Sequence, residues 1–148
     1  MPDSEPRAGS SCHCIGLRRA ANAVSQYYDR CLEGSGLTVN QYSILCNIDS
    51  ISPCSVTELA ARTRLERTTL VRNLKPLLAA DWVRDAAAPG NRRNRLSLTP
   101  SGRERMLAAR EAWERAQRDV ETCFTPEELR TLRTWLLRLE ALGREQHS

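Results

Sequence analysis

Apolar residues recur at alternating steps of three and four along the first part of the chain, from about residue 11 to residue 32. This spacing places them on one face of an amphipathic helix. The face consists of Cys14, Leu17, Ala21, Val24, Tyr28 and Cys31. The sequence Gly34-Ser35-Gly36 ends the predicted helix. Residues 1–10 have almost nothing to bury and are predicted to form a disordered arm.

Helix starts further along the chain are marked by capping boxes, in which Ser or Thr is followed three residues later by Glu or Gln. Thr38 and Gln41 have this spacing and open a short helix that ends near residue 52. Ser55 and Glu58 open a second short helix over residues 56–62. Residues 63–65 are predicted to form a turn.

The next predicted helix begins near Glu66 and carries leucines at helical spacing. These are Leu70, Leu74, Leu77 and Leu78. Pro76 lies within this helix, lacks a backbone N–H, and has a ring that clashes with the preceding turn. A kink or an early end of the helix is therefore expected at this proline.

Two short segments after this helix, residues 82–84 and 95–98, are typical of strands. Pro89-Gly90-Asn91 lies between them and is a turn sequence. The sequence therefore predicts a β-hairpin with a basic tip.

The remainder of the chain is predicted to form two helices. Thr99-Pro100 is typical of an N-cap followed by proline at the first helical position. The long helix after it has an apolar face made of Met106, Ala109, Trp113, Ala116, Val120 and Cys123. A third capping box begins at Thr125 and precedes Leu129, Leu132, Leu136 and Leu139.

The predicted fold is mainly α-helical with a small β-hairpin wing: a winged helix-turn-helix with N- and C-terminal dimerisation helices. After the arm, we expect an N-terminal dimerisation helix within residues 11–36, the winged helix-turn-helix within 37–99, and C-terminal dimerisation helices within 100–148. The terminal helices carry more apolar surface than one small domain easily buries, so a second copy of the chain is the expected partner.

The composition limits the classes of protein to consider. The chain has 148 residues, enough for one hydrophobic core, and 41% of them are hydrophobic. No apolar run approaches the length of about 20 residues that spans a bilayer, and the first residues do not resemble a signal peptide. We therefore expect a cytoplasmic protein without membrane association, whose six cysteines are thiols.

Positive charge is concentrated in the middle of the chain. Residues 62–95 contain nine basic and three acidic residues, a net charge of +6, whereas the whole chain carries +4. A basic segment between near-neutral flanks is typical of a nucleic-acid-binding surface. On charge alone, a solvated arginine-rich face explains the segment equally well.

In a helix-turn-helix, the first turns of the second helix contact base edges in the major groove of double-stranded DNA. Arginine recognises guanine, asparagine recognises adenine, and threonine offers a methyl group to thymine. The predicted base-contacting residues are Arg67, Thr68, Thr69, Arg72 and Asn73. The other predicted DNA-binding residues, for phosphates or the minor groove, are Thr57, Arg62, Lys75, Arg92, Arg93 and Arg95.

These segments resemble the MarR-type (multiple antibiotic resistance) winged-helix regulators. The resemblance covers about residues 37–122 and rests on VTELAARTRLERTTLVRNLKPLLAADWVRD and NRRNRLSLTPSGRE. Within them it rests on a Leu-Ala pair in the first helix, Arg-Thr-Thr opening the second, wing arginine, and Leu-Thr-x-x-Gly. The resemblance implies a homodimer joined through its terminal helices that binds palindromic operators, usually as a repressor. It also implies release from DNA by a small ligand or an oxidant.

The wing departs from the family pattern. The family has Asp-x-Arg before the second strand, whereas this sequence has Gly90-Asn91-Arg92. The arginine is retained, and the aspartate that would orient it is missing. The wing is therefore expected either to be more mobile or to be positioned by another acid such as Asp85.

Cys12-His13-Cys14 is the candidate signal-sensing segment. If it is helical, Cys12 and Cys14 point about 200° apart and cannot bind one ion together, so neither a metal nor a cofactor is predicted. A thiol near a helix N-terminus is favoured as thiolate, and Arg18 and Arg19 follow one turn later. The peroxide-sensing branch of the resembled family has its reactive cysteine at a similar place. Oxidation of Cys14 or Cys12, and binding of a small aromatic or amphipathic ligand, are the two signals considered.

No enzyme is predicted, because both histidines lie near the chain ends and no glycine-rich phosphate loop is present. A pure packing role for the cysteines stays open. The alternative to a regulator is a winged-helix protein that coats DNA without specificity or serves in assembly. A regulator should prefer its site over random DNA by about a thousandfold or more.

Overall fold

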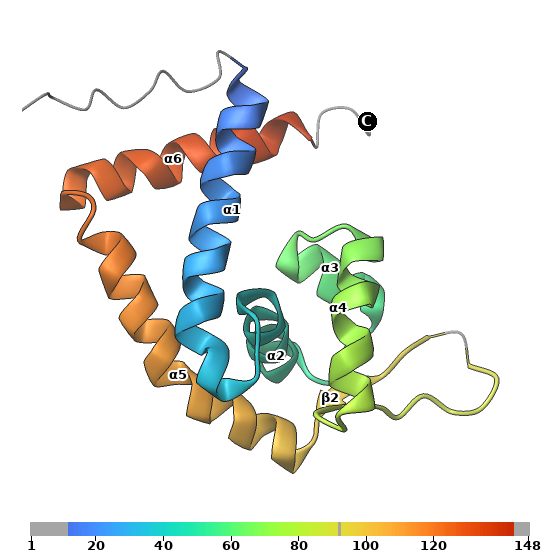
Figure 1. Cartoon of the computed structure of the whole chain (residues 1–148). Helices are drawn as coiled ribbons and strands as arrows, with labels where there is room; N and C mark the ends of the chain where they lie inside the picture. Colours follow the sequence, from blue (N-terminus) through green and yellow to red (C-terminus); the bar gives the residue numbers. More distant parts are fainter. Residues whose placement is uncertain (1–11, 92, 144–148) are drawn as a thin grey trace, which may run out of the picture. The chain divides into compact units, whose positions relative to one another are not determined.

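The computed structural model describes residues 12–91 and 93–143 of the chain (Figure 1). The chain divides into two compact units, Met1–Trp113 and Glu114–Ser148. The arm predicted at residues 1–10 and the predicted DNA-binding residue Arg92 lie outside the described residues.

The first unit begins with helix α1 (His13–Leu32), which passes into a 3-10 turn, η1 (Glu33–Ser35). Gly36 follows with φ of +73°, a left-handed conformation that glycine adopts without strain. The buried residues of α1 are Tyr28 and Leu32, near its C-terminal end, whereas the N-terminal part of its apolar face is exposed.

Helix α2 (Val39–Ile51) starts at the predicted capping box. The backbone N–H of Gln41 donates to Thr38 Oγ1 at 3.2 Å, and the Thr38 N–H donates to Gln41 Oε1 at 3.0 Å. Because both groups belong to the first turn, the start of this helix is set locally.

Helices α3 (Val56–Thr63) and α4 (Arg67–Ala79) are joined by a tight turn in which Arg64 has φ of +57°. Of the kink or early end expected at Pro76, the early end is wrong, because α4 continues to Ala79, and the kink stays a prediction. Leu77, directly after the proline, is completely buried. Burial of a leucine is worth about 1.5–3 kcal/mol, comparable with the cost of a proline inside a helix.

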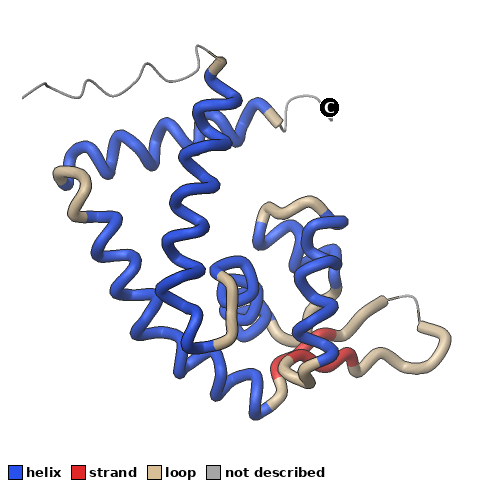
Figure 2. Tube along the Cα trace, viewed as in Figure 1, coloured by secondary structure: helices blue, strands red, loops and turns tan. Residues whose placement is uncertain are grey.

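The predicted hairpin is confirmed. Strands β1 (Val83–Asp85) and β2 (Leu96–Leu98) lie side by side (Figure 2) and pair antiparallel. The first residue of β1 is opposite the last residue of β2. On its other side, β2 pairs with Cys54, from the segment between α2 and α3. The Cys54 N–H donates to the Leu96 carbonyl oxygen at 3.0 Å, and the Leu96 N–H donates to the Cys54 carbonyl oxygen at 2.7 Å.

Helix α5 (Pro100–Glu121) begins at the predicted N-cap: Thr99 Oγ1 accepts from the Gly102 N–H at 3.0 Å. The Thr99 hydroxyl donates to the Asp81 carbonyl oxygen at 2.6 Å, and the Thr99 N–H donates to the Trp82 carbonyl oxygen at 3.1 Å. Gly102 lies so close to the Trp82 backbone that a Cβ would overlap the Trp82 carbonyl. The Leu-Thr-x-x-Gly sequence therefore holds the start of α5 against the turn between α4 and β1.

The core of the first unit lies between the C-terminal end of α1, α2, α3, α4, the hairpin and the first part of α5. Its completely buried large side chains are Leu32, Ile44, Leu45, Ile48, Leu59, Leu70, Leu77, Val83 and Leu96. Arg105 of α5 borders this core: its Nη1 donates to the Ser35 carbonyl oxygen at 3.0 Å, and its guanidinium lies 4.8 Å from the centre of the Trp82 ring.

The second unit contains the end of α5 and helix α6 (Pro126–Leu142), which begins at the predicted Thr125–Glu128 capping box. Large apolar side chains of α6 are exposed, namely Trp135, Leu136, Leu137, Leu139 and Leu142. None of the described helices is long and apolar enough to cross a membrane.

Candidate nucleic-acid interface

Helices α3 and α4 form the helix-turn-helix, and a capping box fixes the start of α3. The Glu58 N–H donates to Ser55 Oγ at 3.1 Å, and Glu58 Oε2 accepts from the Ser55 N–H at 2.7 Å. Leu59 of α3 and Leu70 and Leu74 of α4 are buried against the core. The opposite face of α4 is thereby turned to solvent.

Four predicted DNA-binding residues of α4 have exposed side chains: Arg67, Thr68, Arg72 and Lys75. Thr69 and Asn73 are half-buried, and Asn73 Nδ2 donates to the Thr69 carbonyl oxygen at 2.8 Å. One N–H of the Asn73 amide is therefore engaged within the helix, and the exposed residues form the more accessible part of the face.

Val71 belongs to the same face and was missed by the sequence reasoning. Its side chain is 43% exposed, and it lies one helical turn from both Arg67 and Lys75. An exposed apolar side chain that lies between two basic side chains suits contact with a thymine methyl group. The spacing of Leu70 and Leu74 on the core side would have placed Val71 outward.

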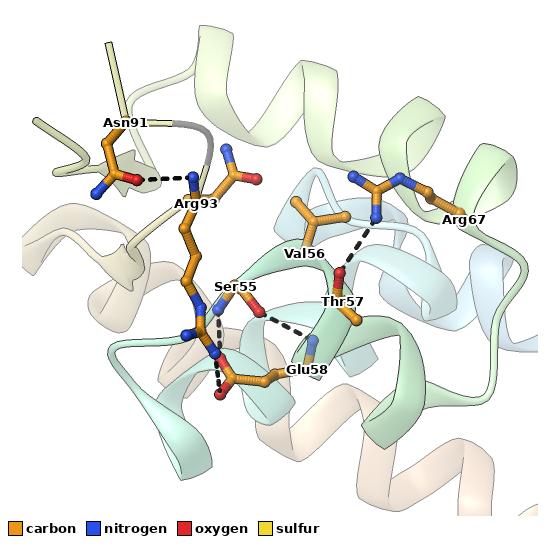
Figure 3. Close-up of a pocket in the computed structure, with 8 residues that line it drawn as sticks. Ser55, Val56, Thr57, Glu58, Arg67, Asn91 and Arg93 are labelled. Atoms are coloured by element: carbon orange, nitrogen blue, oxygen red, sulfur yellow. Dashed lines mark hydrogen bonds and ion pairs between the residues drawn. The ribbon is translucent and has the colours of Figure 1, made fainter. Parts of the chain in front are cut away.

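The predicted phosphate-binding residues of α3 are exposed. Thr57 lies in the first turn of α3, where its Oγ1 accepts from Arg67 Nη1 at 3.3 Å (Figure 3). Arg62 lies in the last turn. The structure brings Thr57 and Arg67 together and leaves Arg62 at the other end of the helix.

Asp85 organises the base of the wing. Its Oδ1 accepts from the N–H groups of Ala87 at 3.0 Å and Arg95 at 2.9 Å, and its Oδ2 accepts from Asn94 Nδ2 at 2.7 Å. The Arg95 N–H bond, followed by the Asn94 bond, lowers the pKa of Asp85. Of the two alternatives for a wing without the family aspartate, these contacts favour positioning by Asp85.

Replacing Asp85 with alanine is expected to loosen this loop. Alanine has no acceptor oxygen for the N–H groups of Ala87 and Arg95, which should therefore exchange with solvent about tenfold faster. Amide hydrogen exchange measured by NMR checks this, with the amides of α2 as unaffected controls. Unchanged exchange at the two N–H groups would contradict the role of Asp85.

The lowered pKa of Asp85 also sets the sign of a pH effect. The carboxylate stabilises the folded loop at pH values above its ordinary pKa, near pH 4, and this contribution is lost as the pH falls through the lower pKa of the folded state.

Arg93 and Arg95 do not lie on a strand, because β2 begins only at Leu96. The Arg93 N–H donates to Asn91 Oδ1 at 3.0 Å. The Arg93 side chain reaches α3, where its Nη2 lies 3.5 Å from Glu58 Oε1 (Figure 3). Arg95 is exposed.

The candidate sensing segment lies at the start of α1. Cys12 is the N-cap residue with an extended backbone, and Cys14 lies in the first helical turn; both side chains are exposed. The prediction that the two thiols point about 200° apart assumed a helical Cys12, and the structure contradicts that assumption. Among the described residues, no group of three or more His, Cys, Asp or Glu side chains is placed to hold a metal ion.

Two other cysteines are packing residues. Cys46 is half-buried against the core and Cys54 is buried. Burial raises the pKa of both thiols, which disfavours the reactive thiolate.

The sequence model of the MarR family matches residues 35–94, from before α2 to the wing. The transcriptional regulator MosR of M. tuberculosis in complex with DNA is 38% identical, with 88% of this chain and 98% of MosR covered and a TM-score of 0.75. A second crystal structure of MosR is 36% identical over 89% of this chain and 98% of that chain, also with a TM-score of 0.75.

A probable transcriptional regulator from Pseudomonas aeruginosa is 26% identical over 87% of this chain and 97% of its own, with a TM-score of 0.77. No curated protein sequence was found to match. The helix-turn-helix, the hairpin wing and these similarities agree, and the chain belongs to the MarR family of winged-helix, DNA-binding transcriptional regulators.

Proposed function

We propose that the protein is a homodimeric repressor that binds a palindromic operator in a sequence-specific manner. The observation that carries this proposal is the exposed face of α4, with Arg67, Thr68, Val71, Arg72 and Lys75 beside one another. These side chains supply guanine-reading, thymine-contacting and phosphate-binding groups on one helix. The DNA complex of MosR, at 38% identity, supports the same mode of binding.

The exposed apolar side chains of the terminal helices support the homodimer. Ile15, Leu17 and Val24 are exposed on α1, and Trp135 and Leu142 are exposed on α6. Exposed apolar side chains on helices are typical of protein–protein contacts. A two-fold symmetric dimer carries two copies of α4, which suits two half-sites of a palindrome.

Selection of bound duplexes from a random-sequence library tests the proposal. The selected duplex should be palindromic and should bind about a thousandfold more tightly than a shuffled duplex. Light scattering should give the mass of a dimer on one duplex. Equal binding to both duplexes would support the DNA-coating alternative instead.

For the signal, we propose oxidation of Cys14, because this thiol is exposed in the first turn of α1 and a peroxide can reach it from solvent. Attack of the thiolate on a peroxide would form a sulfenic acid and release an alcohol or water.

Peroxide is expected to lower operator affinity of the reduced protein, and dithiothreitol should restore it. The Cys14→Ser variant should bind with or without peroxide, whereas the matched variant Cys123→Ser, which removes another exposed thiol, should respond like the wild type. Fluorescence anisotropy on the selected duplex measures the affinity of each protein under each condition. If peroxide does not change the operator affinity of the wild-type protein, oxidation is not the signal, and a small aromatic or amphipathic ligand is the alternative.

A further inference from the structure

A hollow of about 390 Å³ lies at the start of α3, where three parts of the first unit meet. Its lining comes from the α3 N-terminus, from Arg67 of α4, and from Asn91, Arg93 and Asn94 of the wing (Figure 3). The major-groove helix and the wing thus border one site. Glu58 is an acid on this otherwise basic surface, and the proposed function does not account for it.

The two carboxylate oxygens of Glu58 have different partners. Oε2 accepts from the Ser55 N–H at 2.7 Å and completes the α3 capping box, whereas Oε1 lies 3.5 Å from Arg93 Nη2. The Ser55 hydrogen bonds, and to a smaller extent the charge of Arg93, lower the pKa of Glu58. Glu58 is therefore ionised at neutral pH and joins the wing to the first turn of α3.

Among the described residues of the wing, the contacts of Asp85 lie near its base. The strands are three residues long, and the contacts of Asp85 with described residues are those with Ala87, Asn94 and the Arg95 N–H. Arg93 lies nearer the tip of the wing than these contacts of Asp85, and its side chain is 74% exposed. The ion pair with Glu58 thus fastens the tip of a loop to a helix that is itself fixed in the core.

We propose that Glu58 is a positioning residue for DNA binding. It holds the guanidinium of Arg93 beside Thr57 and Arg67, so that the wing and the helix-turn-helix contact the same DNA backbone at a fixed spacing. This inference rests on the proposed function, because it assigns a role within the DNA-binding surface.

Whether neutralising Glu58 strengthens or weakens DNA binding distinguishes this positioning role from simple charge repulsion. An acid near DNA repels phosphates, so neutralising it should strengthen binding to every duplex if charge alone matters. If Glu58 positions Arg93, neutralising it should weaken binding to the operator despite the removal of a negative charge.

The variant Glu58→Gln suits this test because glutamine preserves the capping box. Gln41 serves the same role at the start of α2, where its Oε1 accepts from the Thr38 N–H. The matched control is Glu66→Gln. Glu66 is the exposed N-cap residue of α4, and its side chain makes no capping hydrogen bond.

Affinities are measured on the duplex selected by the wild-type protein and on a shuffled duplex, across a salt series. Glu58→Gln should bind the selected duplex about three- to fivefold more weakly, the scale of a surface ion pair. Its salt slope should be shallower by about 1 per protomer, because one phosphate contact is lost. Glu66→Gln should bind both duplexes more tightly.

Arg93→Gln should show the same loss as Glu58→Gln, and the double variant should lose no more than either single variant. Tighter binding by Glu58→Gln, or additive losses in the double variant, would overturn the positioning role. Failure of the proposed function is a separate result: the wild-type protein itself would then bind the selected and shuffled duplexes alike.

Discussion

The Gly102→Ala variant is expected to lose about 3 kcal/mol or more of its free energy of unfolding. An added Cβ would overlap the carbonyl of Trp82, which is backbone and cannot turn aside as a flexible side chain would. Moving this backbone would also break the hydrogen bond from the Thr99 N–H to the Trp82 carbonyl oxygen. The start of α5 and the turn before β1 would therefore separate.

Thermal unfolding followed by circular dichroism measures this loss, and a fall in Tm of about 10 °C is expected. Gly16→Ala is the matched control: nothing lies within 4 Å of a Cβ at this position in α1, so the variant should be as stable as the wild type or slightly more so. A Gly102→Ala protein with an unchanged Tm would show that the turn relaxes freely.

The Arg72→Ala variant is expected to lose sequence preference while staying folded. Arg72 is exposed on α4, so its removal leaves no cavity, and a bidentate arginine–guanine contact is worth about 1–3 kcal/mol per half-site. Affinity for the selected duplex should therefore fall toward that for a duplex with the half-site guanines replaced.

Competition between these duplexes measures the preference directly. Arg130→Ala is the matched control, because it removes the same charge from the exposed surface of α6. Arg130→Ala should keep the preference of the wild type. A preference retained by Arg72→Ala would remove Arg72 from the base-contacting residues and direct attention to Arg67.

Local features of the fold could be predicted from the sequence. The capping boxes at Thr38, Ser55 and Thr125 involve groups three residues apart, and each forms as expected. The early end expected at Pro76 was wrong. The proline rule takes only the helix itself into account, whereas Leu77 is buried among residues from other elements and its burial favours the continued helix.

The candidate site likewise contains features that local sequence predicts and contacts between distant residues that it does not predict. The outward face of α4 follows from helical spacing, because burial of Leu70 and Leu74 fixes which side chains remain exposed. The pair Glu58–Arg93 joins residues far apart in the sequence, and its formation depends on how the wing folds beside α3. Glu58 was assigned to its capping box from the sequence, and nothing local indicated its second partner.

The pairing of β2 with Cys54 has a consequence for how the protein behaves in a crowded solution. A free strand edge offers unpaired N–H and C=O groups to other chains and is a common starting point of aggregation. The carbonyl oxygen and N–H of Leu96 that face away from β1 are already bonded to Cys54. The wing can therefore be exposed for contact with DNA without offering this edge of its sheet as a template for another strand.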